Sequence, residues 1–113
     1  MAAPTFAVRR GHVPDAVVLT LTGALDAFAA PDLDRAMGEA LAAANPGHAL
    51  VVDLCALEFI AAGGVRALLR ATDAADRVHV PLRVVVGEDQ YVRGVIDRVD
   101  LDGRIPLGGP PAP

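Results

Sequence analysis

Few side chains in this sequence could take part in chemistry, and their types exclude several classes of enzyme. The 113-residue chain contains no Ser and no Lys. Its side-chain hydroxyls belong to four threonines and one tyrosine, namely Thr5, Thr20, Thr22, Thr72 and Tyr91. A serine hydrolase needs a Ser nucleophile, whereas a P-loop nucleotidase and a Schiff-base enzyme both need Lys. The inventory therefore excludes all three classes.

The remaining candidate groups do not form the pattern of an active site or a metal site. The histidines His12, His48 and His79 are far apart in the sequence, and no two have the spacing of metal ligands. Cys55 is the only cysteine, and its apolar surroundings predict a small, buried hydrophobic residue. Glu58 is a lone carboxylate without a partner base or metal. We predict a protein with no enzymatic activity, no cofactor and no metal.

Composition and charge narrow the class of partner. The chain is 53% hydrophobic, enough for one core, and its net charge is -4 with all ten basic residues being Arg. This acidic balance argues against a nucleic-acid partner. The N-terminal sequence lacks the apolar core of a signal peptide, and the apolar runs are far shorter than the roughly 20 residues of a membrane helix. We expect a cytoplasmic protein that does not insert into a membrane.

Hydrophobic periodicity divides the chain into strands and helices that could position a site. Strands are expected at residues 5–9, 16–21, 49–54 and 81–86, with a short final strand at 104–107. Helices are expected to begin at Pro31, near the 61–64 loop and after Gly87. The order β-β-α-β-α-β-α predicts an α/β fold whose mixed, mostly parallel sheet of four to five strands has helices packed on it. We expect one domain at 1–107 and a disordered Gly/Pro-rich tail at 108–113.

Five residues near the expected turns and helix starts each have two interpretations. Asp26 could be a turn or capping carboxylate, or could contact a partner, as the family resemblance described below implies. Gly63 and Gly64 could expose backbone N–H groups to an anion, or could form a tight turn between strand and helix. Arg66 and Arg70 could meet acidic groups of a partner, or could lie on a solvated helix face.

Three segments, in this order and spacing, resemble the STAS domain, the fold of bacterial anti-sigma factor antagonists. They are LTLTGALDAFAAPDLDRAM, ALVVDLCALEFIAAGGVRALLRA and PLRVVVGEDQYVRGVIDRVDLDGRIPL. The first is similar to the family's L-x-G-x-L-D stretch followed by a helix that starts at Pro. The second is similar to its V-x-D-L-x-x-L-x-F-I-D-S-S-G-L stretch and helix, and the third to its last strand, last helix and closing segment. The resemblance covers residues 6–107.

The resemblance also implies a phosphorylation switch, but this sequence departs from the family's motif there. In the family, a Ser at the start of the second helix is phosphorylated by an anti-sigma factor with kinase activity. The motif's Asp falls on Ala61, the phosphorylated Ser on Ala62, the next Ser or Thr on Gly63 and the Gly on Gly64, while Val65 replaces the usual Leu. Ala62 has no hydroxyl to accept phosphate. An Ala in place of a capping residue also costs a helix about 0.5–2 kcal/mol.

The resemblance leads to one main hypothesis and two alternatives. The main hypothesis is an interaction module that binds an anti-sigma factor with an ATPase or kinase fold. Its partner-binding residues would be Asp26, Ala61, Ala62, Gly63, Gly64, Val65, Arg66 and Arg70. STAS domains are also accessory subunits of lipid-transport ABC systems, so the partner could instead be a transporter permease or ATPase. The third hypothesis, a nucleotide sensor, would use the start of the second helix.

Overall fold

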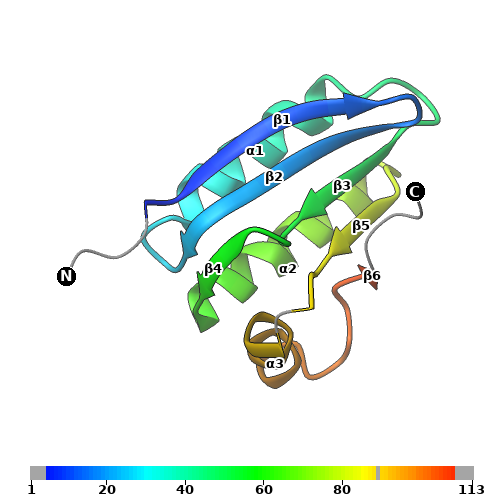
Figure 1. Cartoon of the computed structure of the whole chain (residues 1–113). Helices are drawn as coiled ribbons and strands as arrows, with labels where there is room; N and C mark the ends of the chain where they lie inside the picture. Colours follow the sequence, from blue (N-terminus) through cyan, green and yellow to red (C-terminus); the bar gives the residue numbers. More distant parts are fainter. Residues whose placement is uncertain (1–4, 89, 109–113) are drawn as a thin grey trace.

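The computed structural model describes residues 5–88 and 90–108, which form six strands and three helices. Figure 1 shows α1 and α2 behind the sheet and α3 beside its end. The strands are β1 (Ala7–Val13), β2 (Ala16–Leu25), β3 (Ala49–Asp53), β4 (Leu57–Ile60), β5 (Leu82–Val85) and β6 (Leu107–Gly108). The helices are α1 (Ala30–Ala42), α2 (Ala62–Arg77) and α3 (Gln90–Val99).

The sheet is mixed and mostly parallel, which confirms the predicted α/β fold. Its strands follow the order β1-β2-β3-β5-β6, and β4 pairs with β2 outside this path. Among the strand pairs of the described residues, only β1–β2 is antiparallel, because these two strands are joined directly by the Pro14–Asp15 turn. Parallel neighbours need a crossover connection, and the helices supply it. The described residues thus contain six strands where four to five were expected.

The strand that the sequence did not predict is β4, and it shares β2 with β3. The first half of β2, from Ala16 to Thr20, pairs with β3, and the second half, from Gly23 to Leu25, pairs with β4. Strand β2 thus continues to Leu25, past the point where the sequence suggested that it ends, and its register with β4 shifts between Gly23 and Ala24. The second half of β2 leads to the start of α1, and β4 leads to the start of α2. Because these two strand segments pair, the starts of the two helices follow neighbouring strands.

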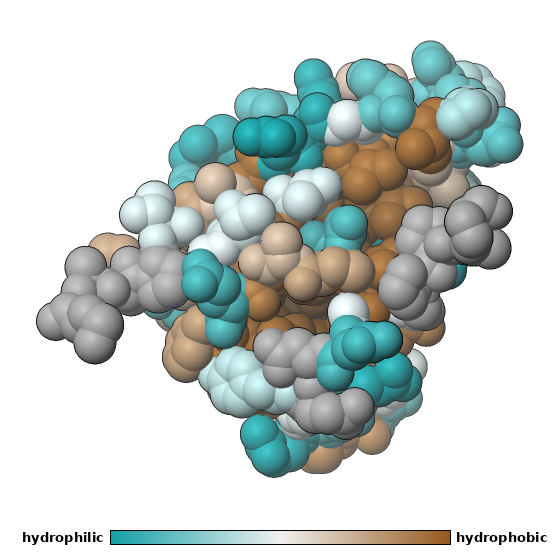
Figure 2. Space-filling view, viewed as in Figure 1, coloured by the Kyte–Doolittle hydropathy of each residue, from teal (hydrophilic) through white to brown (hydrophobic). Residues whose placement is uncertain are grey.

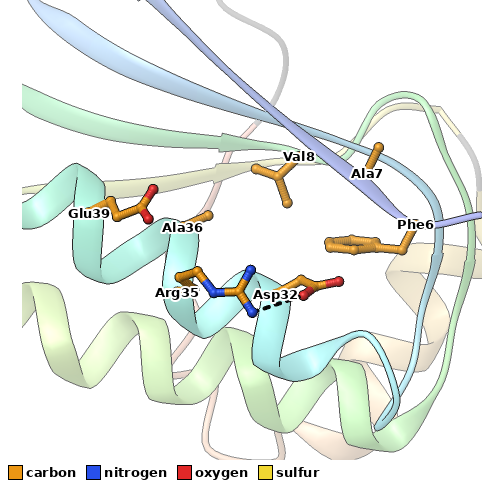
Figure 3. A pocket seen from close by; sticks show the side chains of 7 residues that line it. All are labelled: Phe6, Ala7, Val8, Asp32, Arg35, Ala36 and Glu39. Atoms are coloured by element: carbon orange, nitrogen blue, oxygen red, sulfur yellow. Dashed lines mark ion pairs between the residues drawn. The ribbon is translucent and has the colours of Figure 1, made fainter.

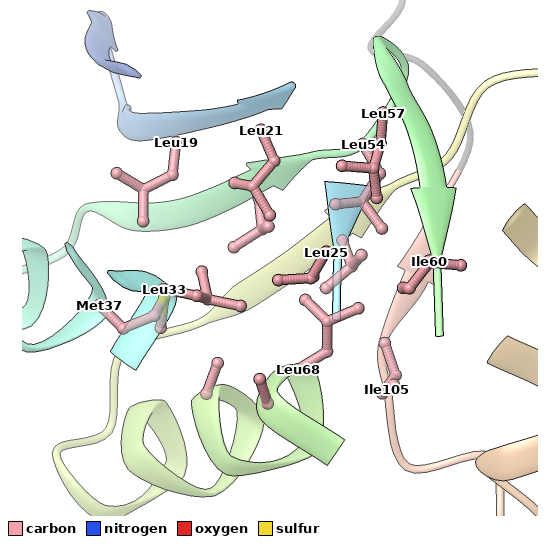
Figure 4. Packing of buried hydrophobic residues seen from close by; sticks show 14 of the residues in the cluster. Leu19, Leu21, Leu25, Leu33, Met37, Leu54, Leu57, Ile60, Leu68 and Ile105 are labelled. Atoms are coloured by element: carbon pink, nitrogen blue, oxygen red, sulfur yellow. The ribbon is translucent and has the colours of Figure 1, made fainter. Parts of the chain in front are cut away.

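The hydrophobic core lies between the sheet and the helices α1 and α2. Side chains of β2 at alternate positions point toward the helices, and Leu19 and Leu21 are almost fully buried. Leu33 of α1 and Leu68 of α2 meet them from the other side, each with none of its surface exposed (Figure 4). This packing fixes both helices to the sheet, so their first residues have defined positions.

The opposite face of the sheet is not covered by helices in the described residues. Figure 2 shows apolar surface on this face, over the middle strands. A hollow of about 560 Å³ lies there, and Val18, Val51 and Val85 contribute to its lining. Parallel strands with apolar side chains on both faces are usually covered on both sides, so this uncovered face is unusual for its topology.

The chain after α3 is held by one buried carboxylate. Asp100 is 8% exposed and accepts hydrogen bonds from the backbone N–H groups of Arg104 (2.9 Å) and Ile105 (2.8 Å). The last strand begins later than the expected 104–107, because the backbone N–H groups of Arg104 and Ile105 are bound to Asp100 and not to a neighbouring strand. Gly108, which the sequence assigned to the tail, is in β6 opposite Val85. Residues 109–113 of the predicted tail lie outside the described residues.

Candidate partner-binding surface

The turn between β2 and α1 is fixed by Asp26. Its Oδ1 accepts a hydrogen bond from the Ala29 N–H at 2.9 Å, and its carbonyl oxygen accepts one from the Ala30 N–H at 3.0 Å. The residue before α1, Ala29, offers no capping side chain of its own, so the Asp26 carboxylate satisfies a backbone donor that would otherwise lack a partner. This geometry supports the capping interpretation of Asp26.

Replacing Asp26 by Ala is expected to lower the free energy of unfolding by about 0.5–2 kcal/mol, the usual effect of losing a capping side chain. Urea unfolding followed by circular dichroism measures this change. Asp26→Asn is the control, since an amide oxygen can accept the same hydrogen bond and should retain most of the stability. An Asp26→Ala variant as stable as the unchanged chain would contradict the capping role.

Helix α2 begins at Ala62, inside the segment 61–64 that was expected to be a loop. Ala61 precedes it in an extended conformation and provides no side-chain cap. The backbone N–H groups of Gly64 and Val65 donate to the Ala61 carbonyl oxygen at 2.9 Å and 3.1 Å. The predicted loop is therefore the first turn of the helix, and this turn lacks a capping side chain, as the sequence suggested. Ala62, at the position of the family's phosphorylated Ser, is half-buried.

The two glycines allow α2 to approach β2 and the following turn very closely. A Cβ on Gly64 would lie 2.3 Å from the carbonyl oxygen of Leu25, and one on Gly63 would lie 2.8 Å from the Ala27 Cβ. The Ala61 N–H also donates to the Leu25 carbonyl oxygen at 3.0 Å. These contacts support the tight-turn interpretation of the glycines. They also join the β2–α1 turn and the first turn of α2 into one surface.

The other predicted partner-binding residues divide into buried and exposed ones. Val65 has none of its surface exposed and Gly64 is buried, so neither residue offers surface for direct contact with a partner in the folded chain. Arg66 and Arg70 are exposed on α2. The Arg70 guanidinium lies 3.3 Å from the Asp34 carboxylate of α1, so this cation is already partly engaged within the chain.

Aromatic residues beside this surface were not identified from the sequence. Phe28, in the β2–α1 turn, is 95% exposed. Phe59 of β4 and Tyr91 of α3 are each 42% exposed, and their ring centroids lie 6.0 Å apart. The Tyr91 hydroxyl donates to the Ile60 carbonyl oxygen at 3.1 Å. A sequence pattern cannot distinguish an exposed Phe from a core one, and no signal in the sequence marked these residues.

Cys55 is exposed because it lies beyond the end of β3. The expectation that it is a buried hydrophobic residue is therefore wrong. Partial burial and the neighbouring Asp53 carboxylate raise the pKa of the Cys55 thiol to about 11. The thiolate is the nucleophile and the metal ligand. Cys55 is consequently protonated at neutral pH and is a poor candidate for either role.

A hollow of about 350 Å³ lies between β1 and α1, but none of the predicted partner-binding residues lines it (Figure 3). Phe6 and Val8 form its apolar part, and Asp32 and Arg35 pair across 3.5 Å at its rim. Small-molecule sites usually enclose the ligand and direct several polar groups toward it. The polar groups of this hollow do not point toward one common position, so we assign it no ligand.

Comparison with known proteins identifies the family. A family model described as "Mlab, STAS domain" matches residues 8–108. The chain belongs to the STAS family. No curated protein matches this STAS chain in sequence. Within the described residues, no helix of this STAS domain is long and apolar enough to cross a membrane.

The solved structures similar to this STAS chain include anti-sigma factor antagonists. An anti-sigma factor antagonist from Mycobacterium paratuberculosis is 28% identical with a TM-score of 0.79, and the match covers 95% of this chain and 89% of that one. Unphosphorylated SpoIIAA, also an anti-sigma factor antagonist, is 19% identical with a TM-score of 0.71, covering 93% and 89%. A variant of RsbS from Moorella thermoacetica is 19% identical with a TM-score of 0.70, covering 92% and 87%. These similarities confirm the fold, and the 28% identical antagonist supports a regulatory STAS module.

Proposed function

We propose that this STAS domain is a non-enzymatic antagonist that binds an anti-sigma factor with an ATPase or kinase fold. The binding surface consists of the β2–α1 turn, residues Ala61, Ala62 and Gly63 at the start of α2, and the exposed Arg66. The observation that carries the proposal is the packing of Gly63 against Ala27. It makes one continuous surface of the two segments that the family resemblance assigns to partner binding.

We further propose that phosphorylation at the start of α2 does not switch this binding. Ala62 has no hydroxyl, and a phosphoryl group would add about -1.5 to -2 charges to such a surface. The Thr72 hydroxyl is buried in α2 and donates to the Leu68 carbonyl oxygen at 2.9 Å, so it cannot replace the missing Ser without local unfolding. Binding would then be constitutive and controlled by the amount of protein.

A tagged capture from a lysate of the source organism, read by mass spectrometry, tests the proposed partner class. We expect recovery of an anti-sigma factor with an ATPase or kinase fold. Recovery of a permease or a transport ATPase instead would overturn the proposal and favour the alternative of a transporter subunit. Incubation of the full chain with the captured kinase and ATP should add no phosphate. Stoichiometric phosphate on a Thr would show that the switch has moved and would overturn constitutive binding.

The variant Ala62→Asp tests the surface itself. It places a carboxylate in the first turn of α2, where the helix dipole favours negative charge, so the fold should persist while partner binding is lost. Ala42→Asp adds the same charge at the exposed far end of α1 and is the matched control. We expect at least a tenfold loss of affinity for Ala62→Asp and little change for Ala42→Asp. Equal affinities would place the binding surface elsewhere.

A further inference from the structure

Phe28 is the most exposed large hydrophobic side chain among the described residues, at 95%. Single exposed apolar residues are common and need no explanation on their own. Phe28 differs because of its place: it lies in the turn that follows Asp26, one residue from Ala27, which contacts Gly63 at the start of α2. It therefore belongs to the surface proposed above for partner binding.

The backbone that carries Phe28 is held in one conformation. Hydrogen bonds from the Ala29 and Ala30 N–H groups to Asp26 close the turn on the C-terminal side of Phe28, and both of these alanines are buried. A partner that receives the ring would not have to order this turn, which lowers the entropic cost of association. Aromatic residues are enriched in the cores of protein interfaces, and here the backbone that carries the ring is already ordered.

The carboxylates that flank Phe28 in the sequence are already engaged within the chain. The Asp26 carboxylate accepts from the backbone, Asp32 pairs with Arg35 at 3.5 Å, and Asp34 pairs with Arg70 at 3.3 Å. The start of α2 beside the turn offers only residues 61–63, which carry no charge and no side-chain hydrogen-bonding group. Apart from the exposed Arg66, the contact that this surface can still offer is therefore apolar.

We propose that Phe28 is the anchor of the interface and inserts its ring into an apolar pocket on the partner protein. The pocket is of phenyl size and is bordered by an uncharged surface that faces Ala62. This inference rests on the proposed function, whose partner class it describes further. It assigns the affinity mainly to burial of one aromatic ring and only secondarily to Arg66.

The test measures the affinity of the purified anti-sigma factor, identified by the capture experiment, for the full-length chain by titration calorimetry. We expect Phe28→Ala to weaken binding by at least about thirtyfold, as is typical for a hot-spot aromatic residue. Leu101→Ala is the matched control, because Leu101 is 84% exposed and follows α3. It should change the affinity less than about twofold. Raising NaCl from about 0.1 to about 0.5 M should weaken binding less than about threefold, since apolar burial is not screened by salt.

The outcomes separate this inference from the proposed function. Both substitutions are at exposed positions and should leave the unfolding transition unchanged, so a loss of affinity reports on the interface. If Ala62→Asp abolishes binding while the affinity of Phe28→Ala stays within about threefold of that of the unchanged chain, the proposed function stands. The assignment of Phe28 as the anchor is then wrong. If the unchanged chain captures no anti-sigma factor, the proposed function fails and this inference fails with it.

Discussion

Replacing Gly64 by Ala is expected to lower the free energy of unfolding by at least about 2 kcal/mol. The new Cβ would lie 2.3 Å from the Leu25 carbonyl oxygen and 2.8 Å from the Leu25 Cγ. The backbone of Leu25 cannot move away easily, because its carbonyl oxygen accepts a hydrogen bond from the Ala61 N–H and the residue pairs with Ile60 in the sheet. Relief of the overlap would require α2 to move away from β2, which would open the core beneath it.

Gly38→Ala is the matched control for this experiment, with an expected effect of opposite sign. Gly38 is exposed in α1, and a Cβ added there would have no atom within 4 Å among its non-local neighbours. Ala is favoured over Gly inside a helix by about 0.5–1 kcal/mol. Urea titrations of both variants measure the two changes. A Gly64→Ala chain that gains stability as Gly38→Ala does would refute the close contact between α2 and β2.

The second large effect is expected for Leu68→Ala, at about 2–5 kcal/mol of lost stability. Leu68 has none of its surface exposed and packs in the cluster that joins α2 to the sheet. Truncation removes most of the side chain and leaves a cavity among neighbours fixed by the sheet. Unfolding in urea should show a lower midpoint with an unchanged slope, because the surface exposed on unfolding stays nearly the same.

Leu101→Ala provides the comparison for Leu68→Ala with the same chemical change. Leu101 is 84% exposed, so its truncation should alter stability by less than about 0.5 kcal/mol. Similar losses for the two variants would mean that α2 is not packed on the sheet as described. A large loss of stability for Leu68→Ala alone would support the packing of α2 on the sheet. The position of Ala62 depends on this packing.

Hydrophobic periodicity predicted most of the fold, because a long apolar run is compatible with few kinds of secondary structure other than a buried strand or helix. The run at 49–54 contains a strand, and the second expected helix is present as α2, with Leu68 on its buried face. The four residues of β4 were missed because so short a segment shows no clear period, and its burial does not alternate either, since Glu58 and Phe59 are both exposed. Only the pairing of β4 with the second half of β2 defines this segment as a strand.

The candidate surface was predicted in part. The family resemblance placed Ala62 at the start of a helix, where the structure also has it. The closeness of Gly63 to Ala27, in contrast, is a contact between residues far apart in the chain, and no local pattern predicts such a contact. The exposure of Phe28 is equally a property of the folded chain, since the neighbouring Ala29 and Ala30 are buried while Phe28 is not.

The division of β2 between two partner strands has a consequence for the order of folding. The β1–β2 hairpin joins neighbours in the sequence, from Val13 opposite Ala16 outward, and closing such a short loop costs little entropy. The pairing of Gly23 with Leu57 closes a much longer loop, and such non-local contacts are slow to form. We expect the β2–β4 pair and the first turn of α2 to form late, so that a partly folded chain would display Phe28 without the surface beside it.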